Sequence, residues 1–156
     1  SRTNAPMTKN KLYTYYYEQD NEVRRFEFVK TYDGADYWDV YDDATGNYLH
    51  TDIYRQNGTF YGETMAGYGG YFLAIPTPFR IGDVQAKYPA DADVTILNTR
   101  GFLTVRGTSY TNVLVLKEVR ASKQTIISYY ATDVGLLLST TEDGRELIVL
   151  AKRQKK

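Results

Sequence analysis

The sequence predicts an all-β protein, an antiparallel meander that forms a barrel or a two-sheet sandwich with about ten strands and little helix. Apolar and polar residues alternate with period two through most of the chain. Turn-forming residues recur roughly every eight to twelve positions, which is the spacing of short antiparallel strands. The 156 residues suffice for one domain with a dry core.

The first half alternates most clearly. Phe26 and Phe28 share one face of their segment, and Trp38 and Val40 share one face of the next. "DG" at 33–34, "DATGN" at 43–47 and "QNG" at 56–58 supply turns between segments, and Asn-Gly is a strong hairpin signal. Locally joined strands are therefore expected over 12–19, 22–32, 37–42, 48–54 and 59–64.

The second half is aliphatic. A connector over 65–92 is glycine-rich and holds prolines in "IPTPF", so it fits a crossover or a short edge strand, with a turn around 84–88. Strands are then expected over 94–98, 102–105, 112–120, 125–131, 136–140 and 145–151. The organisation is a flexible segment 1–10, a single β-domain 11–151 (Tyr-rich meander 11–64, connector 65–92, aliphatic sheet 93–151) and a basic tail 152–156.

Composition excludes several classes of function. The 19 basic and 19 acidic residues balance, which disfavours nucleic acid and anionic membrane as partners. The absence of cysteine excludes disulfides, thiolate zinc sites and a cysteine nucleophile. No apolar run reaches the 18 residues of a membrane-spanning helix.

Tyrosine is the outlier of the composition, with 16 residues, 12 of them before residue 79. Tyrosine pairs an apolar ring with a hydroxyl, which suits contacts with proteins and sugars, although it is also a good strand residue. Tyr13, Tyr15 and Tyr17 alternate and therefore share one face of their strand. The candidate binding residues are Tyr13, Tyr15, Tyr17, Tyr37, Tyr41, Tyr48 and Tyr54, with Tyr68, Tyr71 and Phe72 in the connector.

Other polar motifs are better explained as structure. The acidic stretch "YDGADYWDVYDDATGN" does not match the spacing of a calcium loop, so its carboxylates are expected in turns and on the surface. His50, the only histidine, is expected on the surface beside Tyr48 and Asp52, since no G-x-S-x-G elbow supplies a serine for a triad. "GYGGYF" lacks the phosphate-loop lysine. No catalytic residue, metal site or cofactor is predicted.

The end of the chain resembles a loosely defined group of bacterial exported and lipoprotein β-domains. "YYATDVGLLLSTTEDGRELIVLAK" is similar to the closing hairpin of that group, with Leu138 where lysine is frequent. "VRGTSYTNVLVLKEV" and "PFRIGD" are similar to its upstream segments, so the resemblance covers residues 76 to 151. It implies placement outside the cytoplasmic membrane and a non-enzymatic role. "SRTNAP" then fits either residues left after removal of a signal or lipid-anchor segment, or added residues of a trimmed form.

The leading hypothesis is a non-catalytic extracytoplasmic binding module of a bacterial surface protein or lipoprotein, whose tyrosine face contacts a surface protein or wall glycan. The alternative is a β-barrel carrier of a small apolar ligand, with a cavity lined by Trp38, Phe26, Phe28 and Phe60. A weaker alternative is an enzyme that hydrolyses polysaccharide through a carboxylate pair.

Overall fold

The computed structural model describes residues 7–57, 59–64, 71–76, 80–87 and 92–155. For 56–57, 59–64, 71–76 and 85–87 it describes the backbone alone. These ranges form one twelve-stranded antiparallel sheet and contain no helix, which confirms the all-β prediction. The strands are β1 (Lys11–Tyr17), β2 (Glu22–Tyr32), β3 (Ala35–Asp42), β4 (Tyr48–Asn57), β5 (Thr59–Thr64), β6 (Tyr71–Pro76), β7 (Val84–Lys87), β8 (Ala92–Val105), β9 (Thr108–Arg120), β10 (Thr125–Ala131), β11 (Gly135–Thr141) and β12 (Glu146–Lys155).

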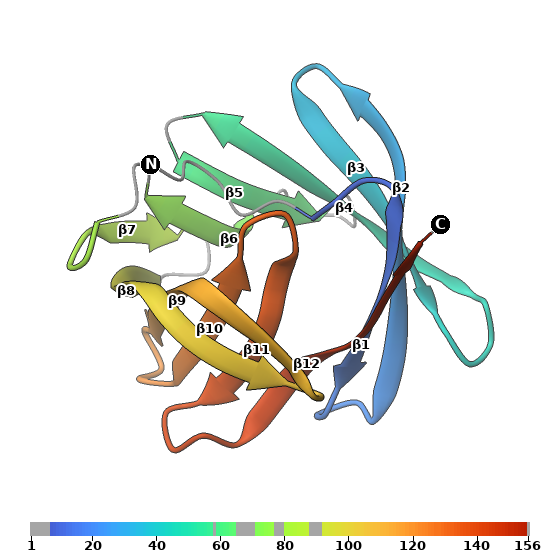
Figure 1. The fold of residues 1–156 in the computed structure, drawn as a ribbon. Coiled ribbons are helices and arrows are strands. Elements are labelled where there is room, and N and C mark those ends of the chain that lie inside the picture. The colour runs from blue at the N-terminus through green and yellow to red at the C-terminus, as the bar shows by residue number, and fades with distance from the viewer. Residues whose placement is uncertain (1–6, 58, 65–70, 77–79, 88–91, 156) are drawn as a thin grey trace.

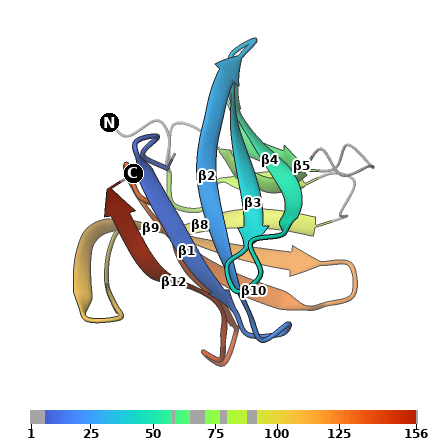
Figure 2. The same cartoon turned by 90° about the vertical axis from the view of Figure 1, so that its right-hand side faces the viewer.

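The sheet consists of two meanders, β1–β6 and β7–β12, joined where the first strand pairs with the last. Within β1–β6 and within β7–β12 each strand pairs with its neighbour in sequence, β1 pairs with β12, and β6 and β7 are the two edge strands of the hydrogen-bonded order. The sheet curls so that β1–β4 and β8–β12 face each other across an interior (Figure 1). Seen from the side, β8 and β10 cross behind β1–β4 (Figure 2). Cα atoms of β6 come within 8 Å of those of β7 and β8, although no backbone ladder joins β6 to β7 within the described ranges.

Turn residues fix the hairpins. Asp33 and Gly34 both have positive φ, at 51° and 74°, as a tight turn between antiparallel strands requires. Arg106 and Gly107 repeat this pair of conformations between β8 and β9, at 50° and 85°. The prediction that "DG" at 33–34 forms a turn is therefore confirmed.

The core lies on the concave face of the sheet. Trp38 and Val40 of β3 are at most 1% exposed, and Trp38 packs edge-on against Phe28 at 5.6 Å between ring centroids. Phe26 is buried on the same face. The predicted inward alternation of β2 and β3 is therefore correct.

Three boundaries differ from expectation. The two strands predicted around "TRG" form one strand, β8, because irregular register between Asn98 and Gly101 absorbs the break without ending the ladder. The turn expected around 84–88 is the edge strand β7 over Val84–Lys87. The residues expected as a basic tail extend β12 to Lys155, which pairs with Lys11 of β1.

Candidate functional site

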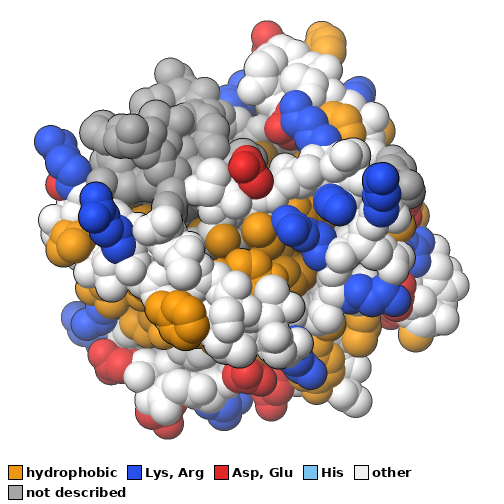
Figure 3. Space-filling model, in the orientation of Figure 1, with side chains coloured by type: hydrophobic (Ala, Val, Ile, Leu, Met, Phe, Trp, Pro, Cys, Tyr) orange, Lys and Arg blue, Asp and Glu red, His pale blue; other side chains and the backbone are white. Residues whose placement is uncertain are grey.

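A cavity of about 410 Å³ opens on the concave side of the sheet. Its walls come from β1, β2, β4 and β8–β12, so segments from both halves of the chain meet around it. Hydrophobic side chains are visible at the centre of the face seen in Figure 3, which has the orientation of Figure 1. The apolar part of the wall includes Met7, Phe26, Val94, Leu116, Ile126, Leu136, Leu147 and Ile148.

Four tyrosines line the same cavity: Tyr15, Tyr17, Tyr54 and Tyr130. Burial raises the pKa of each phenol above its ordinary value, so all four stay neutral at physiological pH. The Tyr15 hydroxyl donates to the backbone carbonyl of Leu136 at 2.6 Å. These rings give the wall an aromatic surface with uncharged polar groups.

The strand β4 places a buried acid on this wall. The Asp52 side chain is 7% exposed, and His50 Nε2 lies 3.1 Å from its Oδ1 atom. That distance suits an ion pair, but the contact lacks the direction of a hydrogen bond, and Asp52 Oδ1 has no hydrogen-bond partner. Burial raises the pKa of Asp52, while His50 and Arg24 oppose the rise.

Arg24 of β2 is the second unusual polar group. Its guanidinium lies over the Tyr17 ring, 4.0 Å from the centroid, and pairs with Asp20 at 3.0 Å and Glu22 at 3.3 Å. Both pairs use the terminal NH2 nitrogen, and the buried Nε atom has no hydrogen-bond partner. Arg24 thus lines the cavity with its buried Nε–H group not hydrogen-bonded.

The opposite wall holds satisfied polar pairs. Arg120 Nε donates to Glu118 Oε2 at 2.8 Å, and the Ser128 and Ser139 hydroxyls are hydrogen-bonded at 2.9 Å. The charged lining residues are Arg24, Arg120, Asp52 and Glu118, two positive and two negative. The formal charges of these four residues therefore cancel.

The tyrosines of β1 do share one face, as predicted, but that face is interior. Tyr13 and Tyr15 are 0% and 3% exposed, and their rings stack at 6.3 Å between centroids. Tyr17 packs against the core and lines the cavity. An exposed binding face on β1 is thus wrong for Tyr13 and Tyr15, because the curl of the sheet encloses the side they occupy.

Tyr48 and Tyr54 lie on opposite faces of β4, although even spacing predicts one face. Leu49 is an extra residue in the pairing with β3, since Val40 pairs with His50 and Tyr41 with Tyr48. This bulge leaves Tyr48 outside, 56% exposed, and turns Tyr54 toward the cavity. It also carries His50 inward, so the expectation of a solvent-facing histidine is wrong.

The outer face of β3 and β4 holds the remaining candidate tyrosines whose side chains the structure describes, Tyr37, Tyr41 and Tyr48. Tyr41 and Tyr48 meet edge to face at 5.9 Å. The Arg25 guanidinium lies 5.0 Å from the Tyr41 centroid, and Lys30 lies 5.0 Å from that of Tyr37. Tyr68 lies outside the described residues, as do the side chains of Tyr71, Phe72 and Phe60.

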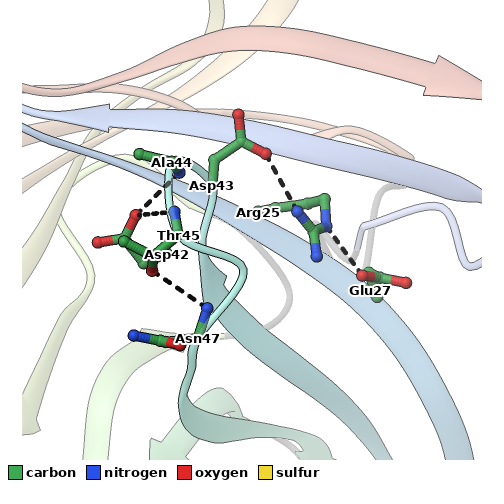
Figure 4. A network of polar contacts seen from close by, with 7 residues as sticks. All are labelled: Arg25, Glu27, Asp42, Asp43, Ala44, Thr45 and Asn47. Carbon is green, nitrogen blue, oxygen red and sulfur yellow. Dashed lines mark hydrogen bonds and ion pairs between the residues drawn. The ribbon is translucent and has the colours of Figure 1, made fainter.

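The acidic stretch at the β3–β4 turn serves the turn itself (Figure 4). Asp42 Oδ1 accepts from the backbone N–H groups of Ala44 and Thr45, at 2.9 and 3.2 Å. Asp43 pairs with Arg25 at 3.2 Å, and Arg25 also pairs with Glu27. Within the ranges that the structure describes, no three acidic or histidine side chains converge as a metal site requires.

Arg24, Asp52 and Glu118 were not predicted as site residues. Their only sequence signal is a charged residue at an inward position of a strand, and the bulge at Leu49 hides that signal in β4. No protein-family model, curated protein or solved structure matches the chain. The described part of the chain contains no helix long and apolar enough to cross a membrane.

Proposed function

We propose that this protein is a non-catalytic binding protein that holds a small, largely apolar ligand inside its curled sheet. The observation that carries the proposal is the cavity of about 410 Å³, which lies within the range of about 300–1,000 Å³ usual for small-molecule sites. Aromatic and aliphatic side chains make up much of its wall, as in such sites commonly, and the charged side chains of Arg24, Asp52, Glu118 and Arg120 also line it. Closure of the sheet into a barrel around the ligand belongs to this proposal and is supported by the approach of β6 to β7.

Placement outside the cytoplasmic membrane is part of the same proposal. It is supported by the resemblance of residues 76 to 151 to exported bacterial β-domains. A carrier on the outer side of the membrane would meet its ligand in the surroundings or at the cell surface.

Native mass spectrometry of protein purified from its own organism tests the proposal directly. An adduct of the mass of a small lipid-like molecule is expected on the folded protein and should disappear on denaturation. The second measurement is titration with N-phenyl-1-naphthylamine, a neutral dye that fluoresces in apolar surroundings. Saturable binding to one site is expected.

A cavity-filling variant locates the dye. Ser128 lines the cavity, so Ser128→Phe should place a ring there and reduce dye affinity at least tenfold. Ser109 is exposed on β9, and Ser109→Phe is the matched control that should leave binding unchanged. If the purified protein carries no adduct and also fails to bind the dye, the proposal is wrong. It is also wrong if Ser128→Phe and Ser109→Phe bind the dye with equal affinity.

The outer tyrosines support a second candidate function, contact with a surface protein or wall glycan. Tyr48 is 56% exposed and Tyr32 is 64% exposed, and exposed tyrosines are common in binding surfaces. The double variant Tyr41→Ser/Tyr48→Ser should then lose binding to soluble wall glycan in a calorimetric titration while retaining dye binding. Unchanged glycan binding, or none by the parent protein, removes glycan from the candidate partners.

A further inference from the structure

The cavity contains two buried polar atoms that the protein itself leaves unsatisfied. Asp52 Oδ1 can accept a hydrogen bond and Arg24 Nε can donate one, yet neither has a hydrogen-bond partner, and His50 Nε2 lies 3.1 Å from the Asp52 atom. Both residues line the cavity, and Asp52 is 5% exposed. Since burying such atoms without partners costs free energy, a bound molecule that pairs with them would recover that cost.

The charges of the cavity restrict what the molecule can be. The lining residues carry two positive and two negative charges, and Arg120 is paired with Glu118 at 2.8 Å. Arg24 is paired with Asp20 and Glu22, so a ligand carboxylate would enter beside three acids, Asp52 included. A ligand ammonium group would meet the Arg24 guanidinium where it covers Tyr17. In a buried site, an added charge of either sign lacks a free counterion.

The aromatic wall indicates the chemistry of the remaining part of the ligand. Tyr17, Tyr54 and Tyr130 surround the polar end with neutral rings, and Phe26 and Leu116 continue the apolar surface. The Arg24 guanidinium lies 4.0 Å from the centroid of the Tyr17 ring, which places these two groups at the same end of the cavity. An apolar body attached to one small polar end matches this distribution.

We infer that the cavity binds an electrically neutral apolar molecule whose polar end carries a hydrogen-bond donor and an acceptor, as a hydroxyl or a primary amide does. Asp52 accepts the donor and Arg24 Nε donates to the acceptor. This inference rests on the proposed carrier function. It adds the class of ligand and the two residues that select it.

Four probes with the same ten-carbon chain test the selection: decanol, decanamide, decanoate and decylammonium. Calorimetric titration at pH 7 should give affinities for decanol and decanamide at least tenfold higher than for the two ions. A tenfold ratio of affinities corresponds to about 1.4 kcal/mol.

Variants assign the effect to the two residues. Asp52→Leu should lower affinity for decanol at least tenfold, whereas Asp52→Asn, which keeps an acceptor oxygen, should lower it less. Arg24→Lys removes the Nε donor and should lower the affinity for decanamide more than the affinity for decanol. Asp93 is exposed on β8, so Asp93→Asn is the matched control. Circular dichroism establishes that each variant is folded.

The outcomes separate this inference from the carrier function. If no probe and no dye binds the parent protein, the carrier function itself is wrong. If all four probes bind equally, or if Asp52→Leu and Arg24→Lys leave folded proteins with unchanged affinities, the carrier function stands and the inference is wrong. Tightest binding of either ion also overturns it.

Discussion

Replacing Tyr13 by serine should remove a large part of the stability of the protein. Tyr13 is fully buried, stacks on Tyr15, and meets Trp38 edge-on at 5.7 Å between centroids. Truncating a buried aromatic side chain costs about 3–5 kcal/mol, because apolar burial is lost and a cavity remains. Against a total of about 5–15 kcal/mol for a domain, that loss leaves a marginal fold.

Two further variants show how much of this loss of stability comes from the hydroxyl and how much from burial of the ring. The Tyr13 hydroxyl accepts from the Thr8 backbone N–H at 2.7 Å, so Tyr13→Phe should cost only about 1 kcal/mol. Tyr16 points to the other face of β1 and hydrogen-bonds Asn21 near the surface at 3.1 Å. Tyr16→Ser is thus a control in the same strand and should cost less than about 1 kcal/mol.

Urea unfolding followed by circular dichroism and Trp38 fluorescence measures all three. With a slope of about 2 kcal/mol per molar urea, a loss of about 4 kcal/mol moves the midpoint down by about 2 M. A midpoint for Tyr13→Ser within about 0.5 M of the parent, at equal slope, would refute the interior placement of the β1 tyrosines.

Three further changes test other parts of the structure by the same unfolding assay. Burial raises the pKa of Asp52 in the folded state, so its contribution to stability is lost as pH rises from its ordinary pKa through the raised one. Asp52→Asn should therefore add about 1 kcal/mol at pH 7 and flatten this pH dependence, and an unchanged pH profile would contradict the assignment. Gly101→Ala should lower the free energy of unfolding by about 1–3 kcal/mol, since a Cβ atom there would lie 3.0 Å from the Val113 carbonyl oxygen. An unchanged urea midpoint would show that β8 and β9 are less closely packed. Thr51→Val should cost about 1 kcal/mol by breaking the 2.7 Å hydrogen bond to Asp39, and no loss would mean that this buried bond contributes nothing.

Alternation predicted the strands and which residues of a strand share a face. Phe26 with Phe28, and Trp38 with Val40, lie together because a strand turns successive side chains to opposite sides. The turn at Asp33-Gly34 was predictable because few residues adopt positive φ easily. These are local rules, and the structure follows them.

Which face is interior was not predictable for tyrosine. A phenol suits water and a core equally well when its hydroxyl finds a partner. The partner of Tyr15 is the carbonyl of Leu136, 121 residues away in sequence, and only the assembled sheet brings them together. The bulge at Leu49 likewise depends on pairing with β3, and it decides whether His50 and Asp52 face solvent or the cavity.

The polar end of the cavity is difficult to explain by stability alone. An apolar side chain at position 52 would avoid the cost of a desolvated carboxylate, and residues that reduce stability are characteristic of functional sites. A ligand that binds only the folded state stabilises it in proportion to the logarithm of its concentration over its dissociation constant. Decanol should therefore raise the melting temperature of the parent protein more than that of Asp52→Leu, while the unliganded variant melts at the same temperature as the parent or higher. If unliganded Asp52→Leu instead melts at a lower temperature than the parent, and decanol raises both melting temperatures equally, Asp52 is a structural residue and not part of the binding site.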